Sequence, residues 1–320
     1  MYSFHVGFGS GQIFIVLVGK LNIGFPCLFV EGLKNTKIIM KIYPIHITNF
    51  KIDGGAMFGV VPKALWSRVV TADGNNLVNW AIRSLLVDTG SRVILVDNGY
   101  GDKLSEKYLR HVHLNGGDGL VGGLAKAGYK PEDVTDMLLT HLHSDHCGGG
   151  VRRGAGGAGY ELVFPNADYI VSRRQWEWAL NPNLREADSY LSENLLPMQE
   201  SGRLRLIDGP MQLCDGVELR IADGHTPGQI IPVVDLGDRK LVFAADLIPT
   251  TYHIPLLWNM SYDLDQLKTI GEKSALLEES AENNYLLMFQ HDLETECCTV
   301  ARTEKGVRVD RRFKINDLRF

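Results

Sequence analysis

Residues 141–146 read His-Leu-His-Ser-Asp-His, so three imidazoles and one carboxylate fall within six positions directly after a short apolar run. In an extended segment residues i and i+2 point to the same side, so His141 and His143 can bind one cation together. Asp145 and His146 follow where the chain turns and can bind a second cation. Burying these side chains without a metal would cost several kcal/mol unless each were hydrogen-bonded. The stretch therefore predicts a metal site at the end of a strand.

Three further ligand candidates lie in separate parts of the chain. His225 lies in the sequence Asp-Gly-His-Thr-Pro-Gly (residues 223–228), where glycine and proline favour a tight turn that presents the ring rigidly. Taken alone it could equally be a surface or core histidine. Asp246 and His291 each follow an apolar strand, and one carboxylate can bridge two cations. Metal-type ligands from four separate segments indicate a site far more strongly than any one residue does.

This ligand set resembles the signature of the metallo-β-lactamase superfamily, in which His-x-His-x-Asp-His is followed by separate His, Asp and His ligands. The resemblance covers residues 40–320 and implies a mixed α/β fold, a four-layer αββα sandwich with its site at one edge of two sheets. It also implies a bridging Asp246 between two metal sites, one formed by His141, His143 and His225 and the other by Asp145, His146 and His291.

The ligand chemistry predicts the metal and the reaction. Imidazole and carboxylate ligands without thiolate suit two zinc ions, with manganese, iron and cobalt as alternatives. Two cations about 3.5–4 Å apart activate a bridging hydroxide and polarise a carbonyl or phosphoryl oxygen, which gives hydrolysis without a nucleophilic side chain. We expect Asp145 to be catalytic by orienting the hydroxide and relaying a proton to the leaving group. The alternative is a metal-stabilised binding protein without turnover, although a structural zinc site needs fewer ligands.

Two segments, residues 53–66 and 88–103, are similar to those of quorum-quenching N-acyl-homoserine lactonases and the related methyl-parathion-hydrolase-like enzymes. The similarity implies a small-molecule lactone or ester as substrate, with an aryl ester or a phosphotriester as the alternative. The first segment would form a loop over the metals, in which Met57, Phe58 and Trp66 contact an acyl chain unless they pack in the core.

The chain departs from that group at one position. Lactonases of this kind carry a tyrosine three residues after the bridging aspartate, where this chain has Pro249. Tyr252 or His253 would have to replace it in contacting the substrate. Two neighbours of the motif have simpler interpretations: Cys147 is expected to be a small buried residue, and Asp97 to serve its hairpin and to hydrogen-bond a metal ligand.

Composition and charge limit the classes of binding partner that we expect for this protein. The 320 residues carry a formal net charge of −5 and are 45% hydrophobic, so there is no basic excess for binding nucleic acid. No segment approaches the roughly 18 unbroken apolar residues that a membrane span needs. Five scattered cysteines do not form a disulfide framework, which favours the reducing cytoplasm. We therefore expect a small-molecule substrate and neither nucleic acid nor membrane as a partner; a homodimer stays open.

The first 39 residues differ from the rest, with apolar, glycine-rich stretches and few charges. We interpret residues 1–39 as an extension or a non-native start, and residues 40–320 as the hydrolase domain. The alternatives are an additional edge strand or hairpin, or an export or anchor segment.

Apolar patterns and turn residues predict the elements of the domain. A glycine-rich, flexible excursion is expected at 148–159, and a loop is expected from Gly54 after the first strand. The expected strands cover residues 41–50, 81–87, 93–96, 133–139, 168–171, 217–221, 230–235, 240–245 and 285–289. The expected helices cover residues 103–109, 119–127, 173–180, 184–199 and 263–283.

Overall fold

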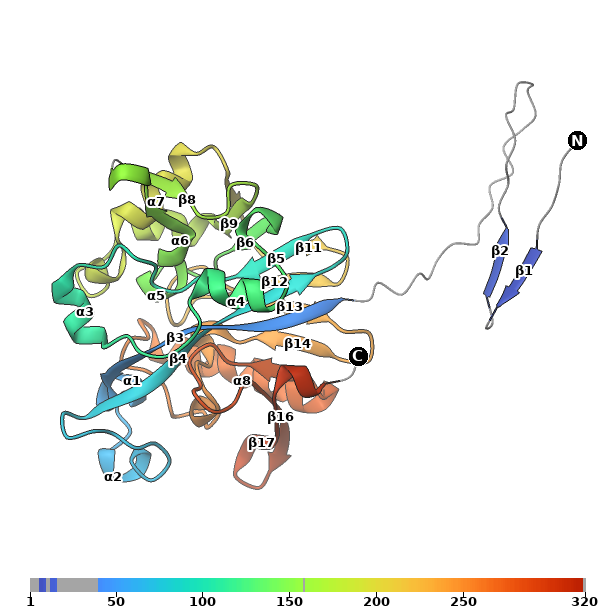
Figure 1. Ribbon diagram of the computed structural model, residues 1–320. Coiled ribbons are helices and arrows are strands. Elements are labelled where there is room, and N and C mark those ends of the chain that lie inside the picture. Colours follow the sequence, from blue (N-terminus) through green and yellow to red (C-terminus); the bar gives the residue numbers. More distant parts are fainter. Residues whose placement is uncertain (1–5, 10–11, 16–39, 158, 319–320) are drawn as a thin grey trace, which may run out of the picture. The chain divides into compact units, whose positions relative to one another are not determined.

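A computed structural model describes residues 6–9, 12–15, 40–157 and 159–318. Two large β-sheets form the centre of the domain that begins at residue 40 (Figure 1). The first sheet has six strands, in the order β10 (Leu204–Ile207), β9 (Asp168–Ser172), β6 (Asp136–Leu138), β5 (Val93–Val96), β4 (Leu77–Asp88) and β3 (Lys41–Asp53). The predicted hairpin of β4 and β5 is confirmed as an antiparallel pair, whereas β5, β6, β9 and β10 run parallel.

The second sheet has seven strands. Their order is β11 (Met211–Cys214), β12 (Val217–Ala222), β13 (Gln229–Asp235), β14 (Lys240–Phe243), β15 (Leu286–Met288), β16 (Cys297–Thr303) and β17 (Gly306–Phe313). Strands β14 and β15 pair in parallel, and the other neighbours are antiparallel. The chain crosses between β14 and β15 through the longest helix, α8, which packs against β16 and β17.

Period-two alternation explains why the two sheets pack face to face. On β5, Ile94 and Val96 enter the core that also contains Val233, Leu241 and other residues of the second sheet. Leu95, between them, enters a separate core on the outer face of the first sheet. Because successive side chains of a strand point to opposite faces, a strand buried on both faces is apolar throughout. The expected four-layer αββα sandwich is confirmed.

Helices cover the outer face of the first sheet and join the strands. The helices α1 to α7 each place at least one side chain in this outer core. The helices are α1 (Gly54–Phe58), α2 (Lys63–Trp66), α3 (Glu106–Val112), α4 (Leu120–Lys126), α5 (Ser144–Cys147), α6 (Arg173–Leu180), α7 (Ser192–Glu200) and α8 (Gln266–Asn283). Within the described residues, no helix is both long and apolar enough to cross a bilayer.

The structure corrects three local predictions. A helix, α1, begins at Gly54 where a loop was expected, because the Asp53 carboxylate caps it by accepting from Ala56 N. The single helix expected over residues 184–199 is wrong: α7 begins only at Ser192, after an irregular loop. The glycine-rich excursion expected at 148–159 contains a short strand, β7 (Val151–Arg153), which pairs antiparallel with β8 (Tyr160–Leu162) directly after it.

The chain divides into two compact units, residues 1–37 and residues 38–320. Strands β1 (Val6–Gly9) and β2 (Gln12–Ile15) pair antiparallel within the first unit. The rest of the segment interpreted as an extension lies outside the described residues. Of the cysteines, Cys147, Cys214, Cys297 and Cys298 are free thiols, and Cys147 is fully buried as expected.

Two glycines that follow the histidine motif in sequence allow two segments of the backbone to touch. A Cβ placed on Gly148 would lie 2.2 Å from the carbonyl oxygen of Tyr100, and one on Gly149 would lie 2.1 Å from that of Asn98. No real Cβ contact is that short, so only glycine fits here. The chain that follows β5 therefore lies directly against the chain that follows the motif.

Gly149→Ala should lower the free energy of unfolding by about 1–3 kcal/mol, because the added methyl group forces two backbones apart. The control is Gly271→Ala in helix α8, where a Cβ meets nothing within 4 Å and alanine should add about 0.5–1 kcal/mol. Urea unfolding followed by circular dichroism measures both. Equal stability of the Gly149 variant and the wild type would contradict the close packing.

Candidate active site

All seven predicted ligands meet at one edge of the two sheets. The motif follows β6, and the other three residues follow strands of the second sheet: His225 comes after β12, Asp246 after β14 and His291 after β15. These strands run in the same direction within their sheet, so their carboxyl ends share an edge. Backbone hydrogen bonds join the two sheets there, from Ile230 N to Thr140 O and from Ala81 N to His291 O.

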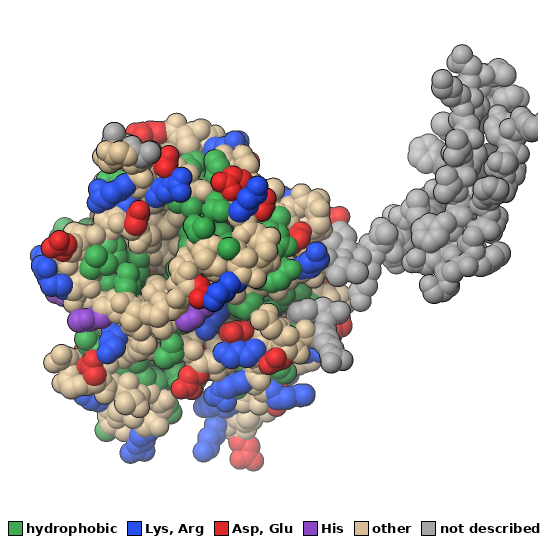
Figure 2. Space-filling view, viewed as in Figure 1, with side chains coloured by type: hydrophobic (Ala, Val, Ile, Leu, Met, Phe, Trp, Pro, Cys, Tyr) green, Lys and Arg blue, Asp and Glu red, His purple; other side chains and the backbone are tan. Residues whose placement is uncertain are grey.

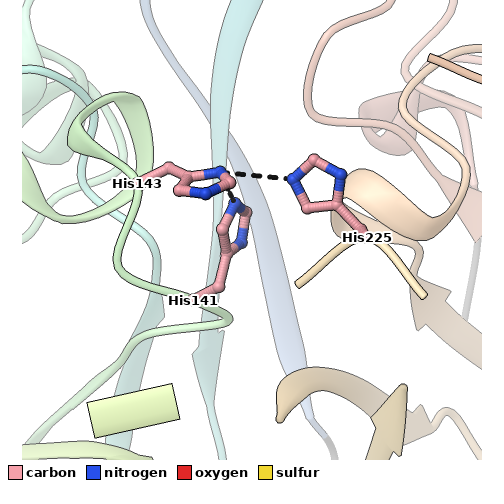
Figure 3. A group of neighbouring side chains, drawn as sticks. All are labelled: His141, His143 and His225. Atoms are coloured by element: carbon pink, nitrogen blue, oxygen red, sulfur yellow. Dashed lines mark hydrogen bonds between the residues drawn. The ribbon is translucent and has the colours of Figure 1, made fainter. Parts of the chain in front are cut away.

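Three histidines form the first set of facing donor atoms (Figure 3). Nε2 of His141 lies 3.1 Å from Nδ1 of His143, and Nε2 of His225 lies 3.2 Å from the same atom. All three residues are buried. Nitrogens this close attract one another only when a proton or a metal cation lies between them, because two lone pairs repel.

A second set consists of Asp145, His146 and His291, whose donor atoms also lie within 4.8 Å of one another. Asp246 lies between the two sets. Its Oδ2 is 3.4 Å from Nε2 of His225, in the first set. Its Oδ1 is 3.1 Å from Nε2 of His291 and 3.5 Å from Nε2 of His146, in the second set. One carboxylate thus presents one oxygen to each set.

Every histidine of the cluster donates its outer ring N–H to an oxygen. The pairs are His143 with Glu186 (3.1 Å), His225 with Asp263 (2.9 Å), His146 with Asp97 (2.9 Å), His291 with the carbonyl of Ala81 (2.9 Å) and His141 with the hydroxyl of Thr140 (3.0 Å). An acceptor outside the ring holds the proton on the outer nitrogen and leaves a lone pair on the inner one. The inner nitrogens are therefore arranged as ligands.

The electrostatics of the cluster favour positive charge. Burial and the neighbouring His146 hold the pKa of His141 well below its usual range, so this ring is neutral. Burial opposes protonation of His146 as well, but Asp145 and Asp246 outweigh it and raise its pKa well above the usual range. Burial likewise opposes ionisation of Asp246, yet His146 and His291 hold its pKa well below the usual range.

Two atoms of the cluster are buried without a hydrogen-bond partner among the described residues, Nε2 of His146 and Oδ1 of Asp246. An unpartnered buried polar atom costs about 1–3 kcal/mol. Both atoms point into the space shared by the second set, where a cation would satisfy them. The set of donor atoms, the two buried atoms without a hydrogen-bond partner and the electrostatic preference for positive charge beside the carboxylates all fit a pair of divalent cations.

The expected role of Asp97 in hydrogen bonding is confirmed. Its carboxylate accepts from His146 and from both the backbone N–H and the hydroxyl of Thr140. Its backbone φ is 57°, in the left-handed region, and Ala245, just before Asp246, has a φ of 43°. Such strain is uncommon in residues other than glycine, and here it aims two carboxylates at the cluster.

A cavity of about 400 Å³ opens beside the cluster. Residues of the motif and of the cluster form part of its lining, and side chains from β3, α1, α3 and several loops form the rest. The residues that complete the lining are Phe50, Ile52, Met57, Tyr100, Tyr108, Val112, Arg185, Glu186, Ser189, Met260, Ser261 and Tyr262. One wall is mainly apolar, which suits the body of a small organic molecule.

The predicted substrate contacts all lie in the described part of the chain, and of them only Met57 lines the cavity. Phe58 lies behind it, stacked between Trp66 (5.5 Å) and the ring of His253 (5.0 Å). The nitrogen Nε2 of His253 lies 2.8 Å from the carbonyl oxygen of Met57 and donates to it, so His253 fixes α1. Tyr252 is partly buried against the outer core. These four residues pack behind the cavity wall.

Sequence reasoning missed Glu186 and Asp263, which hold the outer nitrogens of His143 and His225. Both were placed in predicted helices, but each lies in a loop before the helix begins. Their partners are 43 and 38 positions away. No local pattern marks these carboxylates, because only the tertiary structure brings them to the histidines.

On the face of the domain shown in Figure 2, acidic and basic side chains are interspersed, and neither sign of charge dominates.

Known proteins are similar to this chain in sequence and in structure. A sequence profile described as the metallo-beta-lactamase superfamily matches residues 79–151. An N-acyl homoserine lactonase of Bacillus cereus is 27% identical over 244 residues, which are 71% of this chain and 87% of the relative.

Two solved structures extend the comparison. A probable metal-dependent hydrolase from Staphylococcus aureus superposes with a TM-score of 0.78 at 30% identity, covering 86% of this chain and 96% of that one. AidC, a dizinc quorum-quenching lactonase in complex with its product, superposes with a TM-score of 0.72 at 22% identity, covering 87% and 96%. At 22% identity, the similarity to AidC shows a shared fold.

Glu186→Gln should weaken metal binding about 10- to 100-fold. The Glu186 carboxylate accepts from both His143 Nε2 and Trp178 Nε1, and an amide would turn an N–H donor towards one of them. Competition with a coloured chelator measures the affinity. Asp188→Asn, an exposed change in the same loop, is the control. Unchanged affinity in the Glu186 variant would show that this contact does not support the site.

Proposed function

The chain is a metal-dependent hydrolase of the metallo-β-lactamase superfamily, and we propose that it is a dinuclear enzyme that opens lactones. In this proposal His141, His143 and His225 would hold one cation, Asp145, His146 and His291 would hold the other, and Asp246 would contribute a carboxylate oxygen to each. When bound, the two cations would supply a water of lowered pKa and polarise the carbonyl of the substrate.

The position of the Asp246 carboxylate carries the proposal. Its two oxygens face two different donor sets, at 3.4 Å from His225 and 3.1 Å from His291. A structural site for one ion needs no such arrangement, and a closed shell would leave no position for substrate. Here a cavity reaches the cluster, which favours turnover over a binding role.

Asp145 is the residue that we expect to move a proton. Its Oδ2 lies 3.6 Å from the inner nitrogens of both His146 and His291, and the residue also lines the cavity. The carboxylate therefore lies between the second donor set and the space for substrate. From there it can accept a proton from the attacking water and pass it to the leaving oxygen.

The cavity supports an acyl lactone as the substrate class. Phe50, Ile52, Met57 and Met260 offer an apolar wall beside the cluster, and the relatives include lactonases that quench quorum signals. Pro249 has no donor group and Tyr252 packs elsewhere, so the phenol groups of Tyr108 and Tyr262, both in the lining, are placed to donate a hydrogen bond to the leaving oxygen, while Asp145 delivers the proton. We further propose zinc as the metal and the cytoplasm as the compartment.

A chelator should abolish hydrolysis, and zinc or manganese should restore it, because the cations supply the reactive water. Purified protein loaded with each metal is assayed on a panel of acyl lactones, aryl esters and phosphotriesters, with bound metal counted by mass spectrometry. We expect two ions per chain and the highest kcat/KM on a lactone. A higher value on an aryl ester or phosphotriester reassigns the substrate; no turnover of any panel member supports a binding protein.

Asp145→Asn should lower kcat about 10²- to 10⁴-fold, the usual contribution of a general acid or base, because an amide cannot accept the proton. Metal content is measured in the same samples. Asp102→Asn, an exposed change outside the cavity lining, should leave kcat unaltered. Full activity of the Asp145 variant with two ions retained contradicts the proton relay.

A further inference from the structure

We propose that Arg185 is a specificity-determining residue that selects substrates carrying a negatively charged group, above all a carboxylate, on the part that reaches the cavity mouth. The inference rests on the proposed function and names a subclass of its substrates: esters and lactones with an anionic arm.

Arg185 lies where substrate must pass. It lines the cavity together with His143 and Asp145, and the next residue, Glu186, holds the outer nitrogen of His143 directly. The loop is fixed by Asn183, whose side-chain oxygen accepts from the backbone N–H groups of both Arg185 and Glu186. Arg185 is therefore placed by the same loop that supports the metal site.

The guanidinium is anchored at one nitrogen and open at the others. Nη2 of Arg185 donates to the carbonyl of Ser261, on the opposite wall of the cavity. Ser261 is itself held, since its N–H donates to the carbonyl of Ala56 at 2.8 Å. Within the described residues, Nε and Nη1 donate to no protein acceptor, and Nη2, which gives one N–H to Ser261, keeps a second. One edge of the guanidinium, formed by Nη2 and one of these two nitrogens, therefore remains for a ligand. Such an edge matches the two oxygens of a carboxylate.

The charge of Arg185 is not neutralised by the described part of the chain. None of its carboxylates forms an ion pair with Arg185, although Glu186 is adjacent in sequence, because the Glu186 side chain turns inwards to His143 and Trp178. The neighbouring lining residues Ser189 and Ser261 are neutral. A cation held at the mouth without a counter-ion favours an anion over a neutral amide, which gains less from a charged donor.

The test compares two aryl esters with the same leaving group. One is the 4-nitrophenyl half-ester of suberate, which carries a terminal carboxylate too distant to attack its own ester; the other is its terminal amide. Wild type should prefer the anionic ester. Arg185→Met should lower kcat/KM for that ester about 10- to 100-fold and for the amide far less. Arg110→Met is the control: it removes one positive charge from an exposed position on α3 that does not line the cavity.

Binding is measured separately from turnover, by calorimetry with suberate monohydroxamate and octanohydroxamate. The charged probe should bind wild type and Arg110→Met more tightly than the neutral one, and Arg185→Met should lose that difference while keeping its thermal midpoint. Equal affinity of wild type for both probes, including no binding, or an unchanged preference in Arg185→Met, overturns the inference. Loss of activity on the neutral ester overturns it too, because Arg185 would then be a general structural residue. If neither ester is hydrolysed, the calorimetry alone decides the role of Arg185, and the proposed function is decided separately by the lactone panel.

Discussion

The convergence of lone pairs on one point is the constraint on which the rest of the molecule depends. Inner nitrogens of five histidines and oxygens of two carboxylates face one another within a few ångströms, in a region from which water is largely excluded. Such an arrangement is repulsive unless positive charge occupies its centre. The outer hydrogen bonds, the strained backbone at Asp97 and the close glycine packing all hold donors that would otherwise move apart.

The sheet edge makes this convergence feasible. Strands buried on both faces are stiff and give each following loop a fixed starting point, so side chains one to three residues beyond a strand inherit its position. His141, Asp246 and His291 use this arrangement, each close behind a buried strand. Gly148 and Gly149 extend it, because they let the chain after the motif rest on the backbone of Tyr100 and Asn98. The site therefore draws its rigidity from the sandwich.

The cavity is built on a different principle from the cluster. Its walls come from the end of β3, α1, the loop after β5, α3, the loop before α7 and the loop before α8. A few specific hydrogen bonds join the loops and α1. His253 links to the carbonyl of Met57, and Arg185 to that of Ser261. Loops of this kind can vary in sequence without disturbing the strands beneath them. Hydrolytic chemistry and choice of substrate are thus carried by separate parts of the fold.

The sequence alone predicted nine of the strands and the close grouping of the motif, because period-two burial and His-x-His spacing are local properties of the chain. Strands β10, β11, β16 and β17 were not predicted, and the four-layer sandwich was implied by the resemblance of the ligand set to a known superfamily. The sequence also named all seven residues that the structure brings together. It did not identify Glu186 and Asp263 as partners of His143 and His225, nor the cavity position of Arg185, and it placed Phe58, Trp66, Tyr252 and His253 among the substrate contacts, whereas they pack behind the cavity wall. Those assignments depend on where irregular loops lie in space. The reason is physical: a loop's path is set by contacts with residues tens of positions away, which no local periodicity encodes.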